Sequence, residues 1–235
     1  MGVRSMHIAL IPDGNRRFME KRGIGNLLDS YQMGIQRFYD FLEWCVDLGV
    51  SEVTIYALST ENITNRTREE IEILLRVFLE EITKAIHDRR LDENGIGIKV
   101  CGDLNYLNNG VANPQLARKL LSNLMTLEEK TKNYNKLRVN LAIAYGGRQE
   151  IIHAANFVVK EGLPLTEENL RRYLWIPNYP DIIIRTAEER LSNFLLWQSA
   201  YAEIYFVPKL WQEFTREDLE AIINDYNHRE RRFGR

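Results

Sequence analysis

The 235-residue sequence lacks several features that would point to particular classes of protein. It has two cysteines, Cys45 and Cys101, each inside an apolar segment and neither in a CxxC or Cys/His spacing, so we expect buried thiols. No apolar run approaches the roughly 20 residues that span a bilayer. The first residues lead into a short apolar run without the pattern of a signal peptide. We therefore expect a soluble, cytoplasmic protein that can still act against a membrane face.

A strong excess of charge is also missing, because 31 basic and 33 acidic residues give a net charge of −2. Proteins that bind nucleic acid mainly through phosphate contacts are usually strongly basic, so no nucleic-acid partner is expected. There is no P-loop GK[ST] motif. Glycines at 95 and 97 lie at the start of a predicted strand instead of after one, which is typical of a turn and not of a dinucleotide site. Repeats and linkers are absent, and we expect one domain over residues 1–235.

Short apolar runs and helical periods alternate from end to end. The runs are rich in β-branched and aromatic residues and barely alternate with polar ones, as in strands buried on both faces: 7–11, 53–58, 96–101, 139–145, 182–184 and 204–206. Residues 71–86 carry one long apolar stripe, preceded by Thr67 and Glu70 at the spacing of a capping box. Other helical periods fall at 31–45, 113–131, 148–160, 166–174 and 215–226. The alternation predicts an α/β fold with a mostly parallel sheet of about six strands, flanked by helices.

Ligands of such sheets bind at the carboxyl ends of the strands, so the loop after the first strand carries most weight. That loop reads PDGNRRF at 12–18. Gly14 permits close approach of a ligand, the first amides of the following helix suit an anion, and Arg16 and Arg17 fit phosphate oxygens. Asp13 suits such a site only with a hard cation between its carboxylate and the phosphates, as Mg²⁺ provides. A plain Asp-Gly turn with solvated arginines is the alternative interpretation of this loop.

Six segments together resemble the cis-prenyltransferases, the family of undecaprenyl diphosphate synthase. They follow the family's order and cover nearly the whole chain: HIALIPDGNRRF (7–18), YALSTEN (56–62), AYGGR (144–148), IRT with RLSNFLLWQ (184–186 and 190–198), AYAEIYF (200–206) and RERRFG (229–234). The resemblance implies a Mg²⁺-dependent enzyme that joins an allylic prenyl diphosphate to isopentenyl diphosphate with a cis double bond. It also implies a homodimer whose basic C-terminal tail closes the site, with peripheral membrane contact during product release.

The resemblance also assigns roles to residues of this chain. Asp13, Asn15 and Asn62 would be catalytic, with Asp13 organising Mg²⁺ and Asn62 close to the reacting carbons; Glu203 would be a second metal ligand. The substrate diphosphates would be bound by a set of glycine, arginine and serine residues: Gly14, Arg16, Arg17, Ser59, Arg66, Arg185, Arg190, Ser192, Arg232 and Gly234. A growing hydrocarbon needs a dry apolar tunnel, and the stripe at 71–86 is its expected wall, although ordinary core packing explains the same pattern.

The chain departs from the family pattern at four places. Asn26 with Leu27 and Leu28 occupies the place of an arginine, Ser30-Tyr31 replaces a Gly-His pair, Ile63 replaces a tryptophan, and the Arg185–Arg190 loop is one residue short. These changes leave two alternatives open. One is an irregular condensation in which dimethylallyl diphosphate is the acceptor. The other is a non-catalytic subunit, although such subunits typically lose the Asp-Gly-Asn loop that is kept here.

Overall fold

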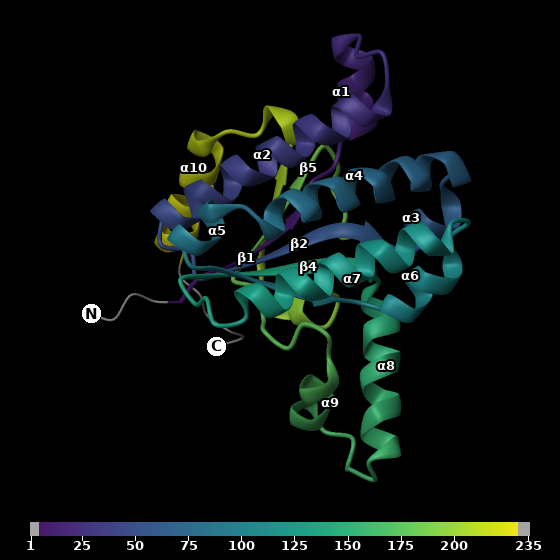
Figure 1. Cartoon of the computed structure of the whole chain (residues 1–235). Helices are drawn as coiled ribbons and strands as arrows, with labels where there is room; N and C mark the ends of the chain where they lie inside the picture. The colour runs from purple at the N-terminus through teal and green to yellow at the C-terminus, as the bar shows by residue number, and fades with distance from the viewer. Residues whose placement is uncertain (1–4, 230–235) are drawn as a thin grey trace.

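The computed structural model describes residues 5–229, which form a six-stranded, wholly parallel sheet (Figure 1). The strand order is β3-β4-β2-β1-β5-β6, and the strands are β1 (His7–Ile11), β2 (Glu52–Ser59), β3 (Ile96–Cys101), β4 (Leu137–Tyr145), β5 (Ile182–Thr186) and β6 (Glu203–Val207). The predicted α/β fold is confirmed. All six predicted strands are present; the first five are largely buried apolar runs, whereas residues of β6 are half-buried or exposed.

Neighbouring residues of one strand face two different hydrophobic clusters. In β1, Ile8 and Leu10 belong to the larger cluster, and Ala9 and Ile11 belong to the smaller one on the opposite face. All five residues of β1 and of β5 are buried. This two-sided burial explains why these runs show no polar alternation.

One face of the sheet is covered by long helices whose apolar sides enter the larger cluster. These are α2 (Leu27–Asp47), α4 (Arg68–Ile86), α7 (Pro114–Thr131) and α10 (Arg216–His228). The predicted capping box opens α4: Thr67 Oγ1 accepts a hydrogen bond from Glu70 N, and the Glu70 carboxylate accepts one from Thr67 N, both at 3.2 Å. The helix therefore begins where the sequence predicts.

The other face is covered mainly by an irregular segment instead of a helix layer. Phe194 and Leu195 from this segment pack against Ala9, Ile11 and Tyr145 of the sheet. Helices α8 (Gly147–Lys160) and α9 (Glu167–Tyr173) pack on each other and project away from the sheet (Figure 1). No helical period announces the segment, since the chain at 187–197 forms only turns and bends.

Shorter helices complete the fold. They are α1 (Asn15–Arg22), α3 (Thr60–Asn65), α5 (Arg89–Glu93), α6 (Leu104–Gly110) and the 3₁₀ turns η1 (Gln198–Tyr201) and η2 (Trp211–Glu213). Helices α3, α5 and α6 were not predicted, because each is too short to display a period. Among residues 5–229, no helix has both the length and the apolar character needed to cross a membrane. Strand β1 lies between β2 and β5, so the strand order reverses beside β1. In such sheets a ligand-binding crevice forms at the carboxyl ends of the strands at this point.

Candidate active site

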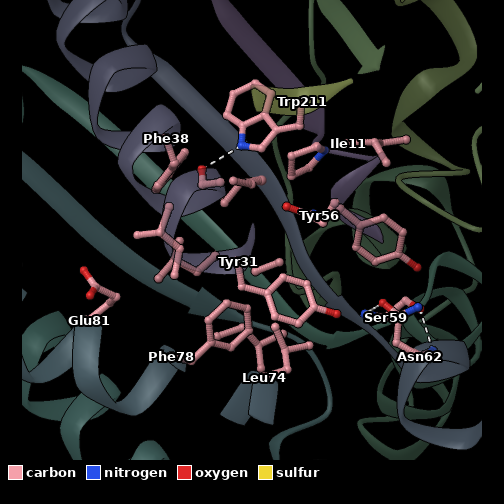
Figure 2. A pocket seen from close by; sticks show the side chains of 18 of the residues that line it. Ile11, Tyr31, Phe38, Tyr56, Ser59, Asn62, Leu74, Phe78, Glu81 and Trp211 are labelled. Carbon is pink, nitrogen blue, oxygen red and sulfur yellow. Dashed lines mark hydrogen bonds between the residues drawn. The ribbon is translucent and has the colours of Figure 1, made fainter. Parts of the chain in front are cut away.

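A cavity of about 660 Å³ begins at the carboxyl ends of β1, β2 and β5 and extends between the sheet and helices α2 and α4. Figure 2 shows Tyr31, Phe38, Leu74 and Phe78 around its apolar part. The polar end contains eight of the predicted site residues: Asp13, Asn15, Ser59, Asn62, Arg66, Arg185, Arg190 and Ser192. One continuous space therefore joins a charged end to a long apolar interior.

Asp13 is held at this polar end by its own backbone. Its carbonyl accepts hydrogen bonds from Thr186 Oγ1 at 2.8 Å and from Trp211 N at 3.0 Å, and its N–H donates to Thr186 Oγ1 at 2.9 Å. One carboxylate oxygen lies 2.8 Å from Arg185 Nη2, and about a third of the side chain stays exposed (35%). The carboxylate is thus fixed in place yet accessible to a cation.

Arg185 forms the floor of the polar end. In the pairing of β1 with β5, Arg185 lies beside Ile11, so it is near the carboxyl ends of both strands. Its side chain is 4% exposed. Nη1 donates to Ser192 Oγ at 2.7 Å and to the carbonyl of Arg190. Nε has no hydrogen-bond partner within the described part of the chain. A buried guanidinium with a free donor favours an anionic ligand.

Gly14 and Asn15 shape the turn between β1 and α1. Gly14 adopts φ 111°, and a Cβ there would lie 2.9 Å from Leu210 Cδ2, so both conformation and space require glycine. Asn15 Oδ1 accepts a hydrogen bond from Gln212 Nε2 at 2.7 Å, and the Asn15 carbonyl accepts one from Ser30 Oγ at 2.6 Å. These contacts hold Asn15, the first residue of α1, at the polar end that it lines, and the start of a helix suits an anion.

The exposed arginines around the polar end are paired with glutamates. Arg16 bonds Glu70 at the start of α4. Arg17 contacts Glu188 at 3.0 Å, and Arg190 donates to the other oxygen of the same carboxylate at 2.5 Å. Exposed pairs of this kind are weak, so they hold these arginines only loosely.

Ser59 and Asn62 cap helix α3 at the end of β2. Ser59 Oγ accepts a hydrogen bond from Asn62 N at 2.9 Å, and Asn62 Oδ1 accepts a long one from Ser59 N at 3.4 Å (Figure 2). The Asn62 Oδ1 contact is at the outer limit of a hydrogen bond, so this amide is only weakly engaged. The cap places both side chains at the polar end of the cavity.

The departures from the family pattern have distinct local environments. Tyr31 lines the cavity, and its hydroxyl accepts a hydrogen bond from Arg66 Nη1 at 2.7 Å. Burial raises the pKa of Tyr31, so its hydroxyl is protonated at neutral pH. Ile63 is buried in the larger cluster. Asn26 is exposed and caps α2 by accepting a hydrogen bond from Asp29 N at 2.9 Å, so it replaces no guanidinium at the cavity.

Glu203 lies at the amino end of its strand, whereas Asp13 lies beyond the carboxyl end of β1. In the β5–β6 pair Glu203 is beside Ile182, three residues before Arg185, whereas Asp13 follows the end of β1. Ile182 also lies beside Ile8 of β1, five residues before Asp13, so at about 3.3 Å per residue the two levels are roughly 16 Å apart along the strands. Glu203 instead pairs with Arg229 Nη1 at 2.7 Å. Strand register therefore separates Glu203 from Asp13 within a single chain, and the role of Glu203 as a second metal ligand stays a prediction.

Two predicted residues, Arg232 and Gly234, lie outside the described residues. Other residues at the site were not singled out by sequence reasoning. Tyr56 stacks on Phe194 with ring centroids 4.6 Å apart and donates to the carbonyl of Ser192 at 3.3 Å. Burial raises its pKa, which keeps the hydroxyl a donor. Its place at the end of a predicted strand, inside a motif, was the available signal.

Comparison with known proteins identifies the family. Residues 11–234 match the family model described as "Putative undecaprenyl diphosphate synthase". A tritrans,polycis-undecaprenyl-diphosphate synthase (geranylgeranyl-diphosphate specific) of Pyrobaculum aerophilum is 40% identical over 97% of this chain and 95% of its own length. An isoprenyl transferase of Thermotoga maritima is 39% identical over 97% and 96%.

Two solved structures extend the comparison. The crystal structure of a "probable undecaprenyl diphosphate synthase" from Campylobacter jejuni has a TM-score of 0.80 at 33% identity, covering 99% of this chain and 100% of that one. Lavandulyl diphosphate synthase from Lavandula x intermedia, in complex with dimethylallyl diphosphate, has a TM-score of 0.85 at 29% identity, covering 97% and 98%. The chain therefore belongs to the undecaprenyl diphosphate synthase family of cis-prenyltransferases, and it is a prenyl-transferring enzyme of this type.

Proposed function

We propose that this chain is a Mg²⁺-dependent synthase that transfers an allylic prenyl group to isopentenyl diphosphate and forms a cis-prenyl diphosphate. The observation that carries the proposal is the continuity of the cavity, in which Asp13 and Arg185 stand at one end of a long apolar interior. Such a space can hold a diphosphate at its charged end and a hydrocarbon along its apolar walls. Residues 1–235 would act as one catalytic domain.

The allylic donor would bind at the turn between β1 and α1. Its diphosphate would meet the first amides of α1, with Gly14 permitting the close approach and Asn15 holding the turn. Arg16 and Arg17 would exchange their glutamate partners for phosphate oxygens, and Arg66 would contribute from the position directly after α3. Asn62 lies at the same end of the cavity, near where the reacting carbons would sit.

The residues present fit a magnesium ion that is shared with a substrate. Asp13 offers one accessible carboxylate, and Mg²⁺ is commonly held by one or two carboxylates together with phosphate oxygens. Within residues 5–229, no group of three or more His, Cys, Asp or Glu side chains could hold a metal. Asp13 would therefore hold the ion with the donor's diphosphate. Bound Mg²⁺ supplies positive charge that stabilises the leaving diphosphate.

The acceptor would bind beside the donor, with its diphosphate on Arg185, Arg190 and Ser192, and with Ser59 and the tail residues Arg232 and Gly234 nearby. As the allylic C–O bond breaks, its electron pair leaves with the diphosphate. The double bond of the acceptor then forms the new C–C bond, and a proton is lost, for which a diphosphate oxygen is the acceptor. The chain's task is to hold the reacting carbons about 3–3.5 Å apart and to exclude water.

An irregular condensation is the second candidate, because the lavandulyl diphosphate synthase has the same fold over nearly all of this chain. The depth of the cavity favours regular elongation. Its walls continue past α4 to the deep residues Leu91, Ile98, Leu120 and Leu127, which is more apolar space than a ten-carbon product needs. The relatives at about 40% identity are named as undecaprenyl or isoprenyl synthases, which also favours a long product.

A homodimer in the cytoplasm, with transient membrane contact for product release, is part of the proposal. Within residues 5–229 β6 pairs only with β5, and Ile204 and Phe206 of β6 are about 40% exposed. Apolar edge strands are usually covered in native proteins, and a second copy would cover this one. Light scattering of the purified chain tests the homodimer. A monomer mass for the wild-type chain and for Ile204→Lys alike would contradict it.

Incubation of the purified chain with Mg²⁺, isopentenyl diphosphate and a panel of allylic diphosphates tests the function. Regular cis products support the first proposal, and product from dimethylallyl diphosphate alone supports irregular condensation. Turnover that requires a related chain would indicate a non-catalytic subunit. Turnover that is unchanged by removal of divalent ions would overturn the role given to Mg²⁺.

A further inference from the structure

The segment that carries Ser192 has an unusual backbone. Ala187, Ser192, Asn193 and Leu195 have φ of 66°, 48°, 65° and 45°, in the left-handed region that residues other than glycine rarely adopt. Asn tolerates this conformation, but Ser and Leu do so at a cost in free energy. Such a backbone persists only where its surroundings enforce it. The contacts that enforce it are therefore the next question.

Asn193 supplies the main contacts, and the first of them go to helix α8. The Asn193 carbonyl accepts a hydrogen bond from Gly147 N at 2.6 Å, and Asn193 Oδ1 accepts one from Arg148 N at 2.9 Å. Helix α8 has no side-chain cap from its own Gly146. Asn193 thus caps α8 from a segment distant in sequence. The opening amides of α8 hold both its main-chain carbonyl and its side-chain oxygen.

The amide group of Asn193 binds two further elements. Nδ2 donates to Glu61 Oε1 on α3 at 2.7 Å and to Gln149 Oε1 on α8 at 3.1 Å. An asparagine amide has two N–H donors, and both are used. Both donors of this side chain are thus engaged by the protein, so none is left for a phosphate oxygen even though Asn193 lines the cavity.

The two glycines at the start of α8 leave room for the segment that carries Asn193. A Cβ at Gly146 would lie 2.3 Å from Gln149 Oε1 and 2.7 Å from Asn193 Nδ2. A Cβ at Gly147 would lie 2.9 Å from Leu196 Cγ and 3.1 Å from the Asn193 carbonyl. The AYGGR motif therefore acts at the site through Asn193, because its glycines leave room for the segment that carries Ser192.

We propose that Asn193 is the positioning residue of the acceptor-diphosphate site. Its contacts with α8 and Glu61 hold Ser192 Oγ and the Arg190 carbonyl where Arg185 Nη1 meets them. The inference rests on the proposed function, since it assumes that Arg185, Arg190 and Ser192 bind the acceptor. It assigns to Asn193 the shape of that anion site and no contact with the reacting atoms.

Titration calorimetry with isopentenyl diphosphate and with inorganic diphosphate, together with steady-state kinetics, tests the proposal. In Asn193→Ala we expect the Kd and KM for isopentenyl diphosphate to rise about tenfold or more, while the KM for the allylic donor stays within about twofold. The matched control is Asn113→Ala, which removes the asparagine cap of α7, where Asn113 Oδ1 accepts from Leu116 N at 3.1 Å. It should lower the melting temperature without changing the acceptor KM.

A charge exchange separates positioning from general stability. Asn193→Asp keeps the acceptor for Arg148 N but places a carboxylate oxygen against Glu61, so acceptor affinity should fall at least as far as in the alanine variant. In Glu61→Gln/Asn193→Asp the glutamine returns a donor to this contact, and affinity should recover to within about threefold of wild type. No recovery, or an Asn193→Ala variant with unchanged acceptor Kd and KM, would overturn the proposal. A wild-type chain that binds neither diphosphate would overturn the proposed function instead.

Discussion

One oxygen of the Asp13 carboxylate meets Arg185, the other accepts from Gly14 N at 2.6 Å, and the side chain stays about a third exposed, so its charge and its size can be tested separately. Asn has almost the same shape and can still accept a hydrogen bond from Arg185 Nη2. Asp13→Asn should therefore stay folded but lose about a thousandfold or more in turnover, because the negative ligand for the proposed Mg²⁺ is gone. Product formation with Mg²⁺ and a thermal melt followed by circular dichroism give the two readouts.

The control is Asp40→Asn, which removes a carboxylate of similar exposure that pairs with Arg37 on α2. Its turnover should match that of the wild-type chain. Near-normal rates in Asp13→Asn would contradict the metal site.

The Tyr31 hydroxyl fixes the Arg66 guanidinium at the cavity, and Phe tests that contact alone. Tyr31→Phe should lower the free energy of unfolding by about 1 kcal/mol and raise the KM for the allylic donor severalfold, because Arg66 loses the acceptor that orients it. Since burial raises the pKa of Tyr31, its ionisation has no part in activity near neutral pH, so the pH profile should keep its shape. Tyr134→Phe, which removes a surface hydroxyl bonded to Asp92, is the kinetic control.

At the scale of elements, the start of α8 is packed so closely that one methyl group should disturb it. Gly147→Ala places a Cβ 2.9 Å from Leu196 Cγ, and overpacking of this kind costs about 1–3 kcal/mol. Urea unfolding measures the loss. Gly25→Ala is the matched control, since nothing lies within 4 Å of its Cβ. Equal stability of the two variants would show that the segment at 193–196 moves aside freely.

The amino end of β1 should make stability depend on pH. Burial lowers the pKa of His7 below its ordinary value, against the opposing charges of Glu52 and Asp181. The unfolded chain then binds more protons than the folded one below about pH 6.5, so stability should fall as the pH drops from about 6.5 toward the lowered pKa. Urea unfolding of the wild type and of His7→Gln, at about pH 7.5 and about pH 5, should show a smaller decrease in the variant.

Strands and long helices could be predicted because burial leaves a direct pattern in the sequence. The runs at 8–11 and 182–184 are apolar throughout because both faces of β1 and β5 are covered. Helix α3 could not be predicted, because it is one short turn that Ser59 and Asn62 cap. The irregular segment before η1 depends on contacts of Asn193 with residues far away in the sequence. The separation of Glu203 from Asp13 has a similar origin, because strand order and register decide at which end of the sheet a residue lies.

For the whole molecule, the cavity sets how long a hydrocarbon the chain can enclose. Ala85 of α4 lines it and is buried, so Ala85→Phe should fill part of the apolar interior and shorten the products. Mass spectrometry of the products measures the change. Ala112→Phe, at an exposed position before α7, should leave the length distribution unchanged. Identical products from both variants would show that chain length is limited elsewhere.

If Asp13 and Arg185 bind the donor and the acceptor as proposed, the ion pair between them would couple the two halves of the reaction. A donor-site ligand that draws the Asp13 carboxylate away leaves Nη2 of the buried Arg185 guanidinium without its counter-charge. The affinity of the acceptor site for an anion would then rise once the donor site is occupied. Thermodynamic reciprocity requires the converse as well. The enzyme would thus tend to load its partners together, and a lone allylic diphosphate would seldom be ionised with nothing beside it to capture the cation.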